Sequence, residues 1–130
     1  MQLESNTVTV NKSAEGLYHF LLDVKNFEQL MPENISKFEV IRDNAFVFAL
    51  KGMPEIALEL KESTPHSKVV LGAISDKIPF TLTASIDEVN DAQSAVKLDF
   101  NGEFNAMMAM MIKGPITKFL ETLSANLSSL

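Results

Sequence analysis

Residues 105–127 read NAMMAMMIKGPITKFLETLSANL, and the apolar side chains of the second half repeat with the period of a helix. One helical face is formed by Ile116, Phe119, Leu120, Leu123 and Leu127. Polar residues fill the positions between them, which is typical of an amphipathic helix. Because an apolar helical face must be buried against another element, we expect a long C-terminal helix that packs on the rest of the chain.

The start and the middle of this helix contain two distinctive residues. Asn105 is a suitable N-cap, because its side-chain oxygen can accept a hydrogen bond from a free amide of the first turn. Pro115 has no N–H to donate to the carbonyl of Met111. We therefore expect a kink or a fresh helix start at Gly114-Pro115.

The central part of the chain alternates apolar and polar residues with a period of two. Turn residues at 43–44, 65–67 and 90–91 separate the alternating runs. This pattern is typical of an antiparallel meander with one buried face. The side chains expected on that face are Phe38, Val40, Phe46, Phe48, Leu50, Ile56, Leu58, Leu60, Phe80, Leu82, Ala84, Ile86, Val96, Leu98 and Phe100.

The N-terminal third predicts one strand and two short helices. Residues 3–10 are rich in Thr and Val and predict a strand. The first helix carries Leu17, Phe20, Leu21 and Val24 on one face, with Asn11 or Ser13 as its cap. Asp23 can cap the second helix, which ends at Pro32.

This order of elements resembles the helix-grip fold of the START/SRPBCC superfamily, which includes polyketide cyclases, lipid-transfer domains and pollen-allergen-like proteins. Residues 11–21, 23–32 and 105–127 carry the resemblance. It covers residues 1–130 as a single domain. The resemblance implies an α+β fold in which a curved antiparallel sheet of about six or seven strands wraps around the C-terminal helix. Where many members have Trp in the second helix, this chain has Phe27.

Charge and composition exclude several classes of partner. The chain has 11 basic and 17 acidic residues, a net charge of −6, which argues against binding to nucleic acids or anionic lipid surfaces. The longest apolar run, 106–112, is far shorter than the roughly 20 residues that a membrane span requires. The first six residues do not have the pattern of a signal peptide. With no cysteine to form disulfides or thiolate metal sites, we expect a cytoplasmic protein.

The inward-facing strand positions hold no group that could transfer a proton. His19 lies opposite the apolar face of the first helix, and His66 lies in a turn, so both are interpreted as surface histidines. We expect neither histidine to have a companion cysteine or a neighbouring carboxylate at ligand spacing. The sequence therefore predicts no catalytic residue, no metal site and no cofactor.

Four methionines crowd the first half of the C-terminal helix. At about 100° per residue, Met107, Met110 and Met111 share a face, which we expect to point inward, while Met108 diverges toward solvent. Methionine is flexible and polarizable, so such a face suits an adaptable cavity wall. Ordinary gap-filling in a core is the alternative interpretation.

The sequence favours a noncatalytic module that binds a hydrophobic small molecule between the sheet and the C-terminal helix. The resemblance implies a lipid, an isoprenoid or an aromatic polyketide as ligand. The residues expected to contact it are Phe38, Phe48, Leu58, Leu82, Phe100, Met107, Met111 and Leu120.

Two alternatives remain open. One is a cyclase- or dehydratase-type enzyme that uses polar groups such as Ser5, Thr7, Thr9, Tyr18 or Ser75. The other is a protein-interaction domain with a filled core, for which homodimerisation through Met108 and the C-terminal leucines is the simplest form.

Overall fold

The computed structural model describes residues 1–53, 55–74 and 79–130. Within these residues, the structure has one antiparallel sheet and three helical segments. In chain order these elements are β1 (Gln2–Glu4), β2 (Val8–Val10), α1 (Ala14–Leu22), the 3-10 helix η1 (Val24–Leu30), β3 (Ile35–Arg42), β4 (Ala45–Leu50), β5 (Ile56–Thr64), β6 (Lys68–Ala73), β7 (Phe80–Asn90), β8 (Gln93–Gly102) and α2 (Ala106–Ser128).

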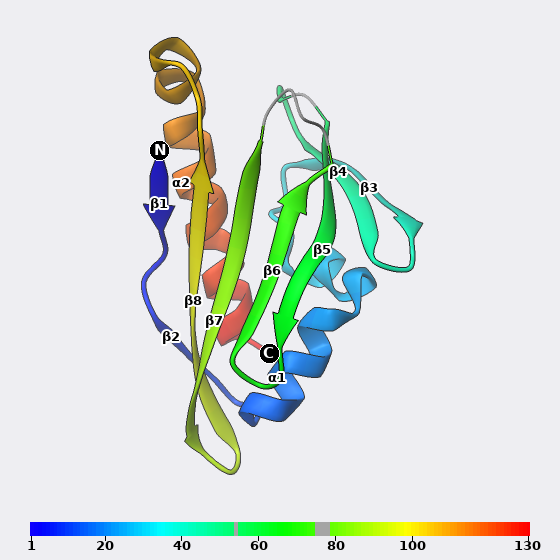
Figure 1. Cartoon of the computed structure of the whole chain (residues 1–130), viewed down its shortest axis with the longest axis vertical. Helices are drawn as coiled ribbons and strands as arrows, with labels where there is room; N and C mark the ends of the chain where they lie inside the picture. Colours follow the sequence, from blue (N-terminus) through cyan, green and yellow to red (C-terminus); the bar gives the residue numbers. More distant parts are fainter. Residues whose placement is uncertain (54, 75–78) are drawn as a thin grey trace.

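The sheet has the order β1-β8-β7-β6-β5-β4-β3, and β2 pairs with β8 beside β1. Strands β3 to β8 form a meander in which each strand is antiparallel to the next. Figure 1 shows α2 running along the sheet behind β8 and β7, with α1 near the end of the sheet where the chain terminates. This arrangement confirms the predicted α+β helix-grip fold.

The predicted first strand is divided into two. Glu4 pairs with Asp99 and Val8 with Val96, so three residues of the first segment lie opposite two residues of β8. Ser5 occupies this bulge, where its amide donates to the carbonyl of Leu98 at 2.8 Å and its Oγ accepts the amide of Leu98 at 2.9 Å. The serine hydroxyl thus replaces a backbone acceptor, and the interruption raises the strand number to eight.

The helix starts follow local capping chemistry. Ser13 Oγ accepts the amide of Gly16 at 3.0 Å, so Ser13 rather than Asn11 caps α1. Asp23 Oδ1 accepts the amide of Lys25 at 3.1 Å at the start of η1. The Asn126 side chain of α2 donates to the carbonyl of Leu30 at 2.8 Å and joins η1 to the end of α2.

The C-terminal helix starts where predicted but does not restart. Asn105 Oδ1 accepts the amide of Met108 at 2.8 Å. The helix then continues through Pro115 to Ser128, so of the two predicted outcomes, a kink or a fresh start, the fresh start is wrong. Apolar side chains on both sides of the proline, Ile112 and Ile116, pack against the hydrophobic core, and this packing offsets the lost hydrogen bond. No helix in the described part of the chain is long and apolar enough to span a membrane.

Strand β3 is less buried than predicted. Val40 is 38% exposed and Phe38 is only half-buried, although they pair with the buried residues Phe46 and Phe48 of β4 and share their face of the sheet. The register of β3 against β4 shifts between Ile35 and Lys37 and again between Val40 and Arg42. Both shifts lie outside Phe38–Val40, so these two residues keep the predicted facing, and their exposure follows from the position of β3 at the edge of the sheet.

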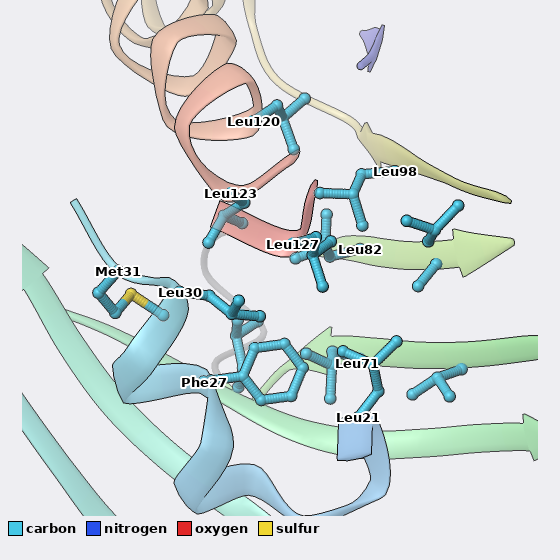
Figure 2. Close-up of a cluster of buried hydrophobic side chains, with 14 of the residues drawn as sticks. Leu21, Phe27, Leu30, Met31, Leu71, Leu82, Leu98, Leu120, Leu123 and Leu127 are labelled. Atoms are coloured by element: carbon cyan, nitrogen blue, oxygen red, sulfur yellow. The ribbon is translucent and has the colours of Figure 1, made fainter. Parts of the chain in front are cut away.

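The space between the sheet and the second half of α2 is filled. Figure 2 shows side chains from three layers meeting there: α1 and η1, the sheet, and α2. The residual void among them is about 10 Å³, roughly the space of a single water. Its wall includes Leu21, Phe27, Leu30, Leu71, Leu82, Leu98, Leu123 and Leu127.

Leu123→Ala should lower the free energy of unfolding by about 2–5 kcal/mol, because the side chain is 2% exposed and its loss leaves a cavity in a packed core. Met110→Ala, on the same helix but 83% exposed, should change it by less than about 0.5 kcal/mol. Urea denaturation of both variants measures the difference. Equal effects of the two substitutions would contradict the orientation of α2.

Candidate functional site

A cavity of about 380 Å³ lies between the sheet and the first half of α2. Strands β4 to β8 provide one side and α2 the other. The lining residues are Phe48, Gly52, Met53, Glu55, Ile56, Ala57, Leu58, Ala73, Phe80, Leu82, Phe100, Phe104, Met108, Met111, Ile112, Ile116 and Phe119. The cavity therefore shares the sheet and the helix with the filled core but lies toward the N-terminal end of α2.

The difference between the two ends has a simple structural cause. At the filled end, Leu21 of α1 and Phe27 and Leu30 of η1 contribute to the packing between α2 and the sheet. None of the described residues that line the cavity comes from α1 or η1. The first half of α2 thus spans the sheet without this third layer, and a void remains beneath it.

Two groups of aromatic rings bound the cavity. Phe48 of β4 and Phe119 of α2 stack with ring centroids 5.2 Å apart and an interplanar angle of 8°. A second set runs along one wall, where Phe100 lies 5.0 Å from Phe80 and 6.0 Å from Phe104. Aromatic rings arranged in this way present flat, rigid apolar surfaces to whatever enters.

Gly102 allows the second aromatic set to form. A Cβ at this position would lie 2.5 Å from the Phe104 ring and 2.8 Å from the Cβ of Phe80. Both distances are shorter than any normal contact, so a side chain at residue 102 would displace part of the wall. The glycine is therefore required for close packing at this point and not for an unusual backbone angle.

The chemistry of the cavity wall is almost entirely apolar. Among the described lining residues, Glu55 is the only one with a titratable side chain, and it is exposed. Its carboxylate accepts a hydrogen bond from Lys37 Nζ at 2.5 Å, and this bond raises the pKa of Lys37. The described part of the cavity wall therefore offers apolar contacts to a ligand, and the Lys37–Glu55 ion pair lies at its edge.

The structure brings five of the eight predicted ligand contacts into the cavity wall: Phe48, Leu58, Leu82, Phe100 and Met111. Phe38 is not among the lining residues and instead stacks on Phe46 at 5.3 Å, near the sheet edge. Leu120 is 1% exposed and belongs to the filled core.

The predicted facing is wrong for Met107, Met108 and Met110. Met108 lines the cavity, whereas Met107 is 73% exposed and Met110 is 83% exposed. Met111 touches the cavity but is itself 69% exposed, which places it at the rim. Because α2 is continuous through Pro115, the apolar stripe of its second half extends back through Ile112 to Met108 at spacings of four. Extending that spacing across the proline would have identified Met108 from the sequence.

The polar residues considered for catalysis lie elsewhere. The Ser5 hydroxyl is held in the β1–β2 bulge, and Thr7 and Thr9 are exposed. Tyr18 is buried, with its ring 5.4 Å from His19 and 5.5 Å from His66, and does not line the cavity. Ser75 lies outside the described residues.

The two histidines are exposed, as predicted, but they are not isolated. Glu15 Oε1 lies 4.0 Å from His19 Nε2, and the rings of His19 and His66 are 5.9 Å apart. The prediction that no carboxylate stands at ligand spacing is therefore wrong. The signal was present in the sequence, because Glu15 and His19 are four residues apart on one helix.

Comparison with known proteins identifies the fold. No family model matches the sequence, and no curated protein matches it. A START superfamily protein from Mycobacterium smegmatis superposes with a TM-score of 0.71 at 15% identity, covering 98% of this chain and 94% of the other. The chain has a START/SRPBCC fold.

Other solved structures have the same fold. Norcoclaurine synthase from Thalictrum flavum, in complex with dopamine and hydroxybenzaldehyde, gives a TM-score of 0.71 at 12% identity, covering 99% of this chain and 86% of the other. A protein from Thermobifida fusca gives 0.70 at 14% identity, covering 98% and 90%. At these identities the likeness concerns the fold of the chain.

Gly102→Ala should lower the free energy of unfolding by about 1–3 kcal/mol, because the new methyl group overpacks the aromatic wall. Gly114→Ala is the matched control, since a Cβ there would have nothing within 4 Å. Gly114→Ala should change the free energy of unfolding by less than about 1 kcal/mol. The higher helix propensity of alanine is opposed by the steric restriction that Pro115 places on the backbone of the preceding residue. Thermal and urea denaturation measure both effects. A Gly102→Ala variant as stable as the wild type would contradict the described packing.

Proposed function

We propose that this protein binds a hydrophobic small molecule in the cavity beneath the first half of α2. The observation that carries the proposal is a void of about 380 Å³ with an apolar wall, in an interface that is otherwise filled. Protein interiors rarely leave gaps larger than a water molecule. Ligand pockets typically measure about 300–1,000 Å³, so this void is in the range of a binding site.

The size and the wall of the cavity favour an aromatic ligand. A dry cavity of about 150 Å³ holds one benzene molecule, so a void of this volume suits a ligand of about two rings. The Phe48–Phe119 stack and the Phe80–Phe100–Phe104 set provide flat faces for offset or edge contacts with such rings. Norcoclaurine synthase, which shares this fold at low identity, has been solved with dopamine and hydroxybenzaldehyde, both aromatic compounds.

The affinity would come from burial of apolar surface, at about 25 cal/mol per Å². The flexible side chain of Met108, with Met111 at the rim, can adapt its shape to different ligands. The Lys37–Glu55 pair at the edge gives a polar substituent a place to remain hydrated. The ligand would therefore combine an apolar body with a polar end.

Enzymatic activity of the cyclase or dehydratase type is the second candidate. It is compatible with the fold shared with norcoclaurine synthase. In the described part of the wall, the group able to accept a proton is Glu55. Glu55→Gln would then abolish turnover and leave ligand binding intact, whereas a pure binding module would show no turnover to lose.

Native mass spectrometry of the purified chain, followed by organic extraction, tests the binding function. We expect a stoichiometric aromatic compound, or a rise in thermal midpoint with two-ring compounds in a panel of lipophiles. A bound fatty acyl or isoprenoid compound would support the binding function but contradict the proposal that the ligand is aromatic. A mass without ligand together with no thermal shift across the panel would overturn the proposal and favour a protein-interaction function.

Lysine substitutions along α2 should affect ligand binding in a graded way. Met108→Lys should weaken it more than about tenfold, because it brings an ammonium group into an apolar wall. Met111→Lys should have a smaller effect, since Met111 is mostly exposed, and Met107→Lys should leave binding within about twofold of the wild type. Titration of an aromatic fluorescent probe measures the series, with circular dichroism as the folding control. A larger loss for Met107→Lys than for Met108→Lys would place the site elsewhere.

A further inference from the structure

Three potential metal ligands meet where α1 faces the turn between β5 and β6. Glu15 and His19 are four residues apart on α1, so they share one helical face. His66 comes from the turn, on an element distant in the sequence. One ligand atom from each of the three side chains lies within 4.8 Å of the others, and all three residues are exposed.

The turn places His66 in an unusual conformation. Pro65 precedes it, its φ is +64°, and the amide of Ser67 donates to the carbonyl of Thr64 at 3.1 Å. This is the pattern of a type II turn, whose third position favours glycine. A side chain at this position is strained. The imidazole that occupies it lies 5.9 Å, between ring centroids, from His19.

A buried tyrosine supports both imidazoles. Tyr18 is 6% exposed, and its ring packs edge-on against His19 at 5.4 Å and against His66 at 5.5 Å. Contact with a fixed ring restricts the rotamers of the two histidines before any ligand arrives. Preorganised side chains lose less conformational entropy when they bind a ligand.

We propose that Glu15, His19 and His66 form a surface site for a divalent transition-metal ion of the zinc class. Two imidazoles and one carboxylate are a recognised zinc ligand set, with the fourth position open to water. Zinc–ligand bonds of about 2.0–2.1 Å bring ligand atoms to about 3.3 Å from one another. The observed separations, up to 4.8 Å, close to this value by rotation of three exposed side chains. The site lies outside the hydrophobic cavity and does not depend on the proposed function.

A bound ion would link α1 to the β5–β6 turn. Because the ion would bind the folded chain and not the unfolded one, it would raise the thermal midpoint. The packing of three aromatic rings could by itself hold the turn against α1, so the experiment must separate packing from metal binding.

Zinc sulfate titrated into the chelator-treated full chain, followed by calorimetry and thermal denaturation, tests the site. We expect saturable binding of one ion per chain and a rise in thermal midpoint. His66→Asn should weaken binding more than about 100-fold, because a ligand is lost. Asparagine tolerates positive φ, so the metal-free midpoint of this variant should stay close to that of the wild type. His19→Ala should lose binding to a similar degree.

Glu28→Gln is the matched control, because it removes an exposed carboxylate of the neighbouring η1 without touching the three ligands. Its zinc affinity should equal that of the wild type. Zinc affinity retained in His66→Asn, or the absence of one-to-one saturation at about 100 μM zinc, would overturn the proposal. A lower metal-free midpoint in His66→Asn with no zinc effect in the wild type would assign the cluster to aromatic packing and overturn it as well.

Discussion

The burial of one apolar stripe of α2 against the inner face of the sheet is the interaction on which the rest of the structure depends. The stripe runs from Met108 through Ile112 and Ile116 to Leu123 and Leu127. It supplies the cover that a one-sided antiparallel sheet requires. Its phase also determines which residues of α2 face the cavity and which face solvent.

The same stripe produces two different environments because its two halves have different partners. The second half is buried against the sheet together with α1 and η1, and almost no space remains. The first half meets the sheet alone, and a cavity results. Leu82 of β7 lines both spaces, and the Phe48–Phe119 stack borders the open one. A rigid packed core can thus anchor a helix whose other half encloses a ligand-sized void.

Function in this chain is suggested by shape and surface chemistry, because the described cavity wall offers little reactive chemistry. Aromatic faces and methionine favour binding by apolar contact. The cluster of potential metal ligands, Glu15, His19 and His66, lies instead on the surface of the protein. The two features use different elements, so a change in one site can be tested without altering the other.

The sequence by itself determined the fold class, the caps at Asp23 and Asn105, and most of the inward strand positions, and it left Asn11 and Ser13 as alternative caps of α1. These features depend on local chemistry and on periods of 2 and 3.6, which the chain carries along its length. The exposure of Val40 lay beyond such reasoning, because it follows from the position of β3 at the edge of the sheet.

Only the tertiary structure decided whether the space under α2 was open. The space depends on the distance between the helix and the sheet and on which other elements pack between them. The periodicity of the sequence encodes neither. The continuity of α2 through Pro115, and with it the facing of Met108, was settled by packing on both sides of the proline. The meeting of His66 with α1 likewise required the folded chain, because residues distant in sequence become neighbours only when the sheet and helix pack together.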